Sequence, residues 1–327
     1  QLREQFSQLV GNPEPDRVVT VPSVSYGMGV VAANLHLQPG DEIVVLYEQF
    51  PSNVYPWLSL AKESRAKVVM VKTPDTENRK GEKWNECLLQ AITPRTRLVA
   101  LPQVHWADGT LFNLQAVRAR TREVDALMVV DGTQSIGALP FNLAEVQPDA
   151  LVISGYKWLL GPYGFGLAYY GPALDGGKPL EQAWINRLNS EDFTGLVNYQ
   201  EAYQPGALRY EAGGRSNFIA VPMLQEAIRQ IEGWGVASIQ GYCQHITRSA
   251  ILQMQEAGFK IEDEDARAAH LFGVRFPEGY PLEKLKEQLK QRQIFVSFRG
   301  DAMRVSPYVY NIAEDLQQLA DCMKGLR

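Results

Sequence analysis

The sequence has few cysteines, no long apolar run and no excess of positive charge. It has only three cysteines, Cys87, Cys243 and Cys322, in 327 residues, an odd and sparse set that does not suit a disulfide framework. No apolar run approaches the roughly 18 residues that a membrane-spanning helix needs, and no signal peptide is visible. A net charge of −5 argues against a nucleic-acid partner or an anionic membrane surface. We therefore expect reduced thiols, a cytoplasmic location and a small-molecule substrate.

Several binding motifs are missing as well. The G-x-G-x-x-G spacing of a dinucleotide site does not occur, and neither does the G-K-[ST] of a phosphate-binding P-loop. No G-x-S-x-G nucleophile turn is present. The four histidines lack metal-ligand spacing, so we expect no metal site. These absences disfavour a nicotinamide enzyme, a nucleotide triphosphatase, a serine hydrolase and a zinc enzyme.

Short apolar strands alternate with helical patterns through the first half of the chain. Such alternation predicts an α/β fold with a mostly parallel sheet covered by helices on both faces. The last strand follows its neighbour after a short glycine-rich link, so we expect it to run antiparallel. The seven predicted strands are 18–21, 43–46, 67–71, 97–101, 127–130, 151–153 and 165–170.

The chain is long enough for two domains. We assign residues 1–236 to a large domain and 237–327 to a small C-terminal α+β domain. Two long helices, at 221–234 and 237–257, should connect them. The small domain should contain strands at 270–276, 294–298 and 303–305, with helices at 282–292 and 312–324.

One lysine lies between an apolar strand and a glycine-rich turn, in Ser154-Gly155-Tyr156-Lys157-Trp158-Leu159-Leu160-Gly161-Pro162. Beside an apolar wall the amine tends to lose its charge, because desolvation disfavours the ammonium form. A neutral amine forms a Schiff base with a carbonyl compound. Taken alone, a lysine in such a place is far more often a solvated loop lysine, and the residues upstream of Lys157 change this interpretation.

An aspartate ends the predicted strand at 127–130. In open α/β sheets, ligands bind outside the carboxyl ends of the strands, and a carboxylate there needs a cationic partner. A protonated pyridine nitrogen is such a partner. The combination of Asp131 with a Schiff-base lysine is what pyridoxal 5'-phosphate (PLP) requires of a protein. An isolated aspartate at this position would more often form a turn or cap a helix, but Asp131 and Lys157 together are more specific.

A candidate phosphate site follows the first predicted strand. Small residues in Pro22-Ser23-Val24-Ser25-Tyr26-Gly27-Met28-Gly29 lead from the strand into an apolar helix. Backbone N–H groups, the Ser25 hydroxyl and the positive end of the helix dipole favour an anion there. By itself this turn is a weak signal.

Together these motifs resemble the PLP-dependent class V aminotransferases of fold type I, the group that includes cysteine desulfurases, isopenicillin N epimerases and kynureninases. The resemblance runs from the Ser23 loop to the last helix. It implies that Lys157 and Asp131 are catalytic and that Arg304 grips the substrate carboxylate with a bidentate guanidinium. It also implies a homodimer with a shared active site. The implied cofactor-binding residues are Val24, Ser25, Phe50 stacking on the ring, Asp131, Gln134 at the ring hydroxyl, Ser154, Tyr156, Lys157 and, from the neighbouring subunit, Ser216.

The sequence departs from the family pattern at three places. His105-Trp106 stands where the family often has an asparagine near the ring, so either His105 contacts the substrate or Trp106 shapes the pocket. The loop Val296-Ser297-Phe298-Arg299-Gly300-Asp301 has no thiol where cysteine desulfurases carry their nucleophile, so desulfuration by that route is not expected. The chain also starts without a methionine, and we expect a further N-terminal segment to precede Gln1.

The resemblance predicts an enzyme that acts at Cα of an amino acid, with transamination as the first expectation. A lyase, an epimerase or a kynureninase-like hydrolase would use the same residues, because fold does not decide the reaction. A homologue that binds PLP without catalysis is a further alternative, and intact Lys157, Asp131 and Arg304 speak against it.

Overall fold

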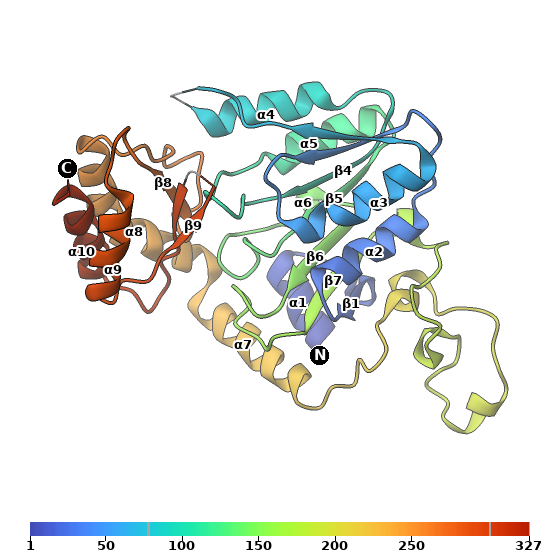
Figure 1. Cartoon of the computed structure of the whole chain (residues 1–327). Helices are drawn as coiled ribbons and strands as arrows, with labels where there is room; N and C mark the ends of the chain where they lie inside the picture. Colours follow the sequence, from blue (N-terminus) through green and yellow to red (C-terminus); the bar gives the residue numbers. More distant parts are fainter. Residues whose placement is uncertain (77–78, 301, 327) are drawn as a thin grey trace.

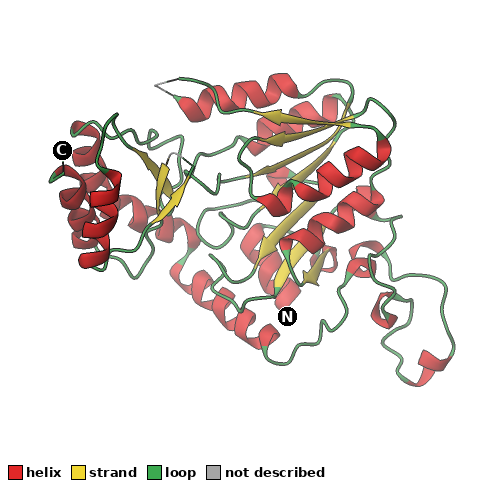
Figure 2. Ribbon diagram, viewed as in Figure 1, coloured by secondary structure: helices red, strands yellow, loops and turns green. Residues whose placement is uncertain are grey.

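The computed structural model describes residues 1–76, 79–300 and 302–326. A twisted sheet with helices on both faces forms the larger part of the molecule, and a small sheet packed against helices forms the rest (Figures 1 and 2). Within the described residues, no helix is long and apolar enough to cross a membrane.

The large sheet has seven strands in the order β1-β7-β6-β5-β4-β2-β3. Strands β2 to β6 pair in parallel, whereas β7 pairs antiparallel with both β6 and β1. The predicted α/β class and the antiparallel last strand are therefore confirmed. The strands are β1 (Val18–Val21), β2 (Glu42–Leu46), β3 (Lys67–Val71), β4 (Thr96–Pro102), β5 (Leu127–Asp131), β6 (Ala150–Ser154) and β7 (Gly166–Tyr170).

The central strands are apolar on both faces because each face supports its own core. Val44 belongs to one buried cluster and Val45 to the other, and Val99 and Ala100 divide in the same way. This follows from the alternation of side chains along a strand. The helices that cover the sheet are α1 (Leu2–Val10), α2 (Val24–Asn34), α3 (Tyr55–Ser64), α4 (Lys80–Ala91), α5 (Leu114–Glu123) and the short α6 (Leu143–Val146).

The C-terminal part has a core of its own, drawn from residues beyond Ile246. Its sheet is antiparallel in the order β8-β10-β9. The strand expected at 294–298 is shorter and later, because only Ser297–Arg299 pairs with β10 before the turn at Gly300. The domain boundary at 236/237 remains a prediction. The elements are α7 (Ala220–Trp234), α8 (Val236–Glu256), β8 (Phe272–Arg275), α9 (Leu282–Gln291), β9 (Ser297–Arg299), β10 (Ala302–Val305) and α10 (Ala313–Lys324).

The segment between β7 and α7 extends away from the body of the molecule (Figure 1). It contains only short 3₁₀ turns, such as Trp184–Asn186 and Thr194–Val197. Several of its apolar side chains are largely exposed, including Phe193, Tyr199 and Phe218, which are 73%, 95% and 89% exposed. Exposed apolar surface of this kind commonly marks an interaction site.

Candidate active site

A cavity of about 280 Å³ opens where β4, β5 and β6 end and where the loops after β1 and β2 approach them. This is the edge at which an open α/β sheet binds its ligands. Eight of the residues predicted to hold a cofactor line this cavity, namely Val24, Ser25, Phe50, Asp131, Gln134, Ser154, Tyr156 and Lys157. The sequence prediction thus selected residues that are far apart in the chain and close together in space.

Lys157 lies in the loop between β6 and β7. The loop is held in shape by two backbone hydrogen bonds, from Gly155 N to Phe165 O at 3.0 Å and from Gly161 N to Gly155 O at 2.8 Å. Burial lowers the pKa of the Lys157 amine, the nearby Asp131 opposes this shift, and the charges of Arg304 and Arg299 add to it. The amine is therefore biased toward the neutral, nucleophilic form.

Asp131 is the last residue of β5 and is only 5% exposed. Its Oδ1 accepts a hydrogen bond from the Thr133 N–H at 3.0 Å. Burial raises the pKa of this carboxyl, while the Thr133 hydrogen bonds and the charge of Lys157 act in the opposite direction. A cation placed in the cavity beside Asp131 would relieve the desolvation of this carboxylate.

Gly137 allows the segment after β5 to pack against the lysine loop. Its φ is +98°, and a Cβ atom at this position would lie 2.3 Å from the Trp158 carbonyl oxygen. Both the backbone conformation and the close approach therefore require glycine. The contact fixes the position of the Asp131 segment relative to the Lys157 segment.

The loop after β1 supplies the anion-binding side of the cavity. The Ser23 side chain caps α2 by accepting a hydrogen bond from the Tyr26 N–H at 3.1 Å. The Ser25 hydroxyl donates to the Ser52 hydroxyl at 2.9 Å, and both serines line the cavity. Helix α2 has 11 residues, so its positive end contributes to anion binding here. Ser52 was missed by sequence reasoning, because it lies in a separate loop that only the fold brings to Ser25.

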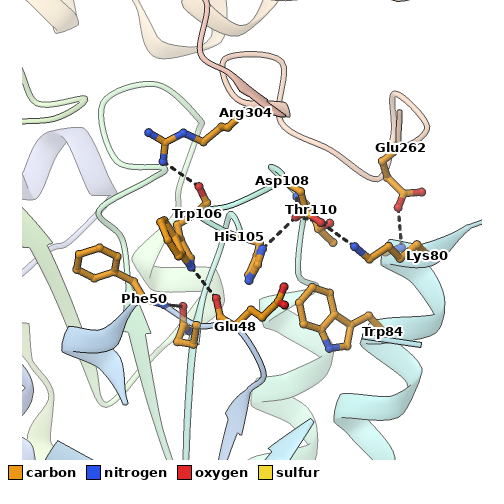
Figure 3. A network of polar contacts seen from close by, with 12 residues as sticks. Glu48, Phe50, Lys80, Trp84, His105, Trp106, Asp108, Thr110, Glu262 and Arg304 are labelled. Atoms are coloured by element: carbon orange, nitrogen blue, oxygen red, sulfur yellow. Dashed lines mark hydrogen bonds and ion pairs between the residues drawn. The ribbon is translucent and has the colours of Figure 1, made fainter. Parts of the chain in front are cut away.

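Phe50 and Trp106 form an aromatic corner of the cavity (Figure 3). Their ring centroids are 5.4 Å apart in a T-shaped arrangement, and the Lys157 amine lies 5.3 Å from the centroid of the Phe50 ring. The Trp106 indole N–H donates to the Glu48 carbonyl oxygen at 2.6 Å, and the Trp106 carbonyl oxygen accepts from Arg304 Nη1 at 3.0 Å. Trp106 therefore connects the cavity to the arginine predicted to bind the substrate.

His105 does not lie in this cavity, so the structure gives its predicted substrate contact no support. Its side chain is 1% exposed and packs edge-on against Trp84, with Nδ1 3.0 Å from Asp108 Oδ1 (Figure 3). The physical reason is that the hydrogen bond to Asp108 and the packing on Trp84 hold the ring away from the cavity. Of the two alternatives at this position, the one in which Trp106 shapes the pocket agrees with the structure.

Asp108 is the centre of a buried ion-pair network between the two parts of the molecule. Lys80 on α4 reaches Oδ2 at 2.8 Å, and Arg275 on β8 reaches the same oxygen at 2.9 Å. The Thr110 hydroxyl donates to Oδ1 at 2.9 Å. Burial alone would raise the pKa of Asp108, but His105, Lys80 and Arg275 hold it well below its usual value. The loop after β4 is thereby attached to the small sheet.

His270 is a second residue whose part in the site the sequence did not reveal. It is completely buried, and burial lowers its pKa to about 4. The neutral ring accepts from the Gln240 amide at Nδ1, 2.6 Å away, and Nε2–H donates to the Gln134 carbonyl oxygen at 2.7 Å. It also packs edge-on against Trp158, whose indole N–H donates to Gln134 Oε1 at 3.1 Å. His270 thus positions the segment that carries Gln134.

Ser216 does not line the cavity within its own chain and is exposed. Its predicted contact comes from a neighbouring subunit and stays a prediction. The three cysteines lie in helices α4, α8 and α10, and none lines the cavity.

The comparison with known proteins agrees with this geometry. The family model "Aminotransferase class-V" matches residues 1–319. The chain belongs to this family. An uncharacterized aminotransferase of Bacillus subtilis, YcbU, is 27% identical over 320 residues, which cover 98% of this chain and 81% of that protein. A probable cysteine desulfurase of Vibrio cholerae is 30% identical over 343 residues, covering 97% of this chain and 80% of the relative.

Solved structures show the same fold. The cystine C-S lyase C-DES superposes with a TM-score of 0.85 at 20% identity, covering 99% of this chain and 85% of that one. A mutant of C-DES has glycine covalently linked to its PLP cofactor, and its structure gives a TM-score of 0.83. The class V enzyme described here has fold type I, and its cofactor is PLP.

The residues of the cavity fit this cofactor. The buried Asp131 carboxylate has no ion-pair partner among the described residues and suits a protonated ring nitrogen. The buried amide nitrogen of Gln49, which also lines the cavity, has no hydrogen-bond partner there. The capped end of α2 suits a phosphate. Asp131 would therefore hold the ring nitrogen of the cofactor, and the start of α2 would hold its phosphate.

Proposed function

We propose that this enzyme transfers the amino group of an amino acid, with Lys157 and Asp131 as its catalytic residues. The observation that carries the proposal is the convergence of a lysine of lowered pKa and a buried aspartate on one cavity with an anion-binding loop. Bound PLP supplies an electron sink for the pair of electrons left when a bond to the substrate Cα breaks.

The chain's own residues have separable tasks in this proposal. Asp131 keeps a proton on the ring nitrogen, because its carboxylate is buried and needs a cationic partner. Lys157 removes and returns the proton at the substrate Cα, for which a depressed amine pKa is suited. Arg304 binds the substrate α-carboxylate, since a guanidinium matches its two oxygens. Phe50 and Trp106 cover the site and limit the access of water.

A second candidate is carbon–sulfur bond cleavage, because the relative from Vibrio cholerae is named a probable cysteine desulfurase. The placement of the cysteines argues against the form of this reaction that uses a protein thiol, since none lines the cavity. Epimerisation and kynureninase-like hydrolysis would use the same groups and give different products.

We also propose a homodimer in which the exposed apolar segment between β7 and α7 approaches the neighbouring subunit and Ser216 reaches its phosphate site. The exposure of Phe193, Tyr199 and Phe218 supports this proposal. The cytoplasmic location stays a prediction.

Two measurements test the function. Borohydride treatment of the protein with PLP, followed by peptide mass mapping, should give an adduct at Lys157 that Lys157→Ala lacks. Incubation with a panel of amino acids should change the cofactor absorbance and yield keto acids. Pyruvate with released sulfide would indicate lyase chemistry, and loss of optical activity without a new product would indicate epimerisation. An absence of any spectral change with every amino acid would refute the proposal.

A further inference from the structure

Three arginines share one face of the small sheet. Ala302 on β10 is paired with Arg275 on β8 and with Arg299 on β9, and Arg304 follows Ala302 by two residues on the same strand. Side chains two residues apart, or directly opposite on neighbouring strands, lie on the same face of a sheet. Since Arg275 binds Asp108 of the large domain, this shared face is directed at the loop after β4.

The partners of these arginines differ. Arg275 is neutralised by Asp108, whereas neither Arg299 nor Arg304 forms an ion pair with any described carboxylate. Arg299 Nη1 donates to the Phe298 carbonyl oxygen at 2.7 Å, and Arg304 Nη1 donates to that of Trp106 at 3.0 Å. The buried Nε of Arg304 has no hydrogen-bond partner among residues 1–76, 79–300 and 302–326. A guanidinium has five N–H donors, so both groups keep donors for a ligand.

Both free guanidinium groups lie against Trp106, which forms a wall of the cofactor cavity. The Arg299 guanidinium carbon is 5.5 Å from the centroid of the Trp106 ring, and Arg304 is bonded to the Trp106 backbone. After burial, which has the largest effect, both charges lower the pKa of the Lys157 amine, and Arg299 also lowers that of Arg304. The two guanidinium groups therefore lie near the reactive lysine, although neither lines the cavity itself, and the carboxylate that lines it among the described residues is that of Asp131.

One guanidinium is sufficient for the α-carboxylate of an ordinary amino acid. An apolar substrate side chain would leave the second charge partly desolvated and unpaired, which is unfavourable. We infer that the substrate is an amino acid with an acidic side chain, whose distal carboxylate or sulfur oxyacid group binds Arg299 while Arg304 binds the α-carboxylate. The inference rests on the proposed function, because Arg304 is assigned to the α-carboxylate there.

Unreactive acids test the arginine pair without turnover. Succinate and glutarate have two carboxylates and butyrate has one, and none of them has an amino group. We expect one of the diacids to bind the PLP-loaded protein at least about tenfold more tightly than butyrate in calorimetric titration, as one charge-assisted contact implies. Arg299→Gln should remove this preference and change butyrate binding much less than diacid binding, whereas Arg304→Gln should weaken the binding of all three acids.

A surface arginine of the same part of the chain provides the matched control. Arg248→Gln, on the exposed side of α8, removes the same charge and should leave every affinity unchanged. In turnover, kcat/KM for aspartate or glutamate should fall at least about tenfold in Arg299→Gln. The small value for asparagine or glutamine should change much less, because these substrates feel Arg299 only through its charge near Lys157 and Arg304. Arg299→Lys should restore part of the loss.

The outcomes separate this inference from the proposed function. The acidic-substrate inference is overturned if butyrate and both diacids bind equally tightly, or if Arg299→Gln lowers the affinity for all three acids by the same factor. This holds even if amino acids change the cofactor spectrum. If the preference for diacids depends on Arg299 but no amino acid reacts, Arg299 and Arg304 still bind an acidic ligand together, and the proposed transamination is refuted.

Discussion

Replacing Asp108 with asparagine should strongly destabilise the folded protein. The substitution keeps the shape of the side chain but removes, in a buried site, the negative charge of the oxygen that Lys80 and Arg275 contact at 2.8 Å and 2.9 Å. Removing one partner of a buried ion pair costs about 3–5 kcal/mol. We expect a loss of this size in the free energy of unfolding from urea denaturation of the PLP-loaded protein.

The pH dependence of this loss provides a second check. The pKa of Asp108 is held well below its usual value in the folded state, and an unfolded aspartate titrates near about 3.9. The stabilisation is therefore fully present above about pH 4 and disappears as the pH falls through the folded-state pKa. The difference in the free energy of unfolding between wild type and Asp108→Asn should be constant from about pH 5 to 8 and should become smaller in more acidic solution.

Asp125→Asn, an exposed control, should change the free energy of unfolding by less than about 0.5 kcal/mol. A loss below about 1 kcal/mol in Asp108→Asn would refute the reasoning.

Three further results are expected. Gly137→Ala should unfold at a lower urea concentration than Gly164→Ala, because both glycines have positive φ but only Gly137 has a backbone oxygen within 2.3 Å of the added carbon; equal midpoints would contradict the assigned contact. Asp131→Asn should weaken PLP binding to the cofactor-free protein about 10- to 100-fold, as the loss of one charge-assisted hydrogen bond implies, measured by fluorescence titration. Arg304→Gln should raise the pKa of the Lys157 amine in the cofactor-free protein, because it removes a neighbouring positive charge. The pH dependence of Lys157 acetylation, followed by mass spectrometry, measures this pKa. An unchanged pH profile would exclude the electrostatic interaction between Arg304 and Lys157.

The strand pattern could be predicted because it has a local signal, and Asp131 and Lys157 stand out because each follows an apolar strand. The other cofactor residues are implied by the resemblance to the family, and their roles stay predictions. Apolar runs of four to seven residues mark the buried strands, and the polar residue that ends a strand must lie at the edge where ligands bind. Asp131 and Ser154 end β5 and β6 respectively, and Lys157 follows three residues later. These residues lie close together because β5 and β6 are neighbours in the sheet.

The remaining part of the site depends on contacts between distant segments, which leave no periodic signal. The orientation of His105 is determined by Asp108, whose charge is in turn balanced from α4 and β8. His270 reaches Gln134 across 136 positions of sequence. The shortening of the strand expected at 294–298 reflects its pairing with β10 alone at an edge of the small sheet. These contacts can be identified only once the tertiary structure is known.

The ion-pair network at Asp108 has a consequence for molecular recognition. This network already joins the small sheet to the loop that carries Trp106. The guanidinium groups of Arg299 and Arg304 should therefore lose little conformational freedom when a ligand binds, and the distance between them should stay fixed. Acids of unsuitable length should then be rejected rather than accommodated, and discrimination between homologous compounds that differ by one methylene group would arise from rigidity of the frame.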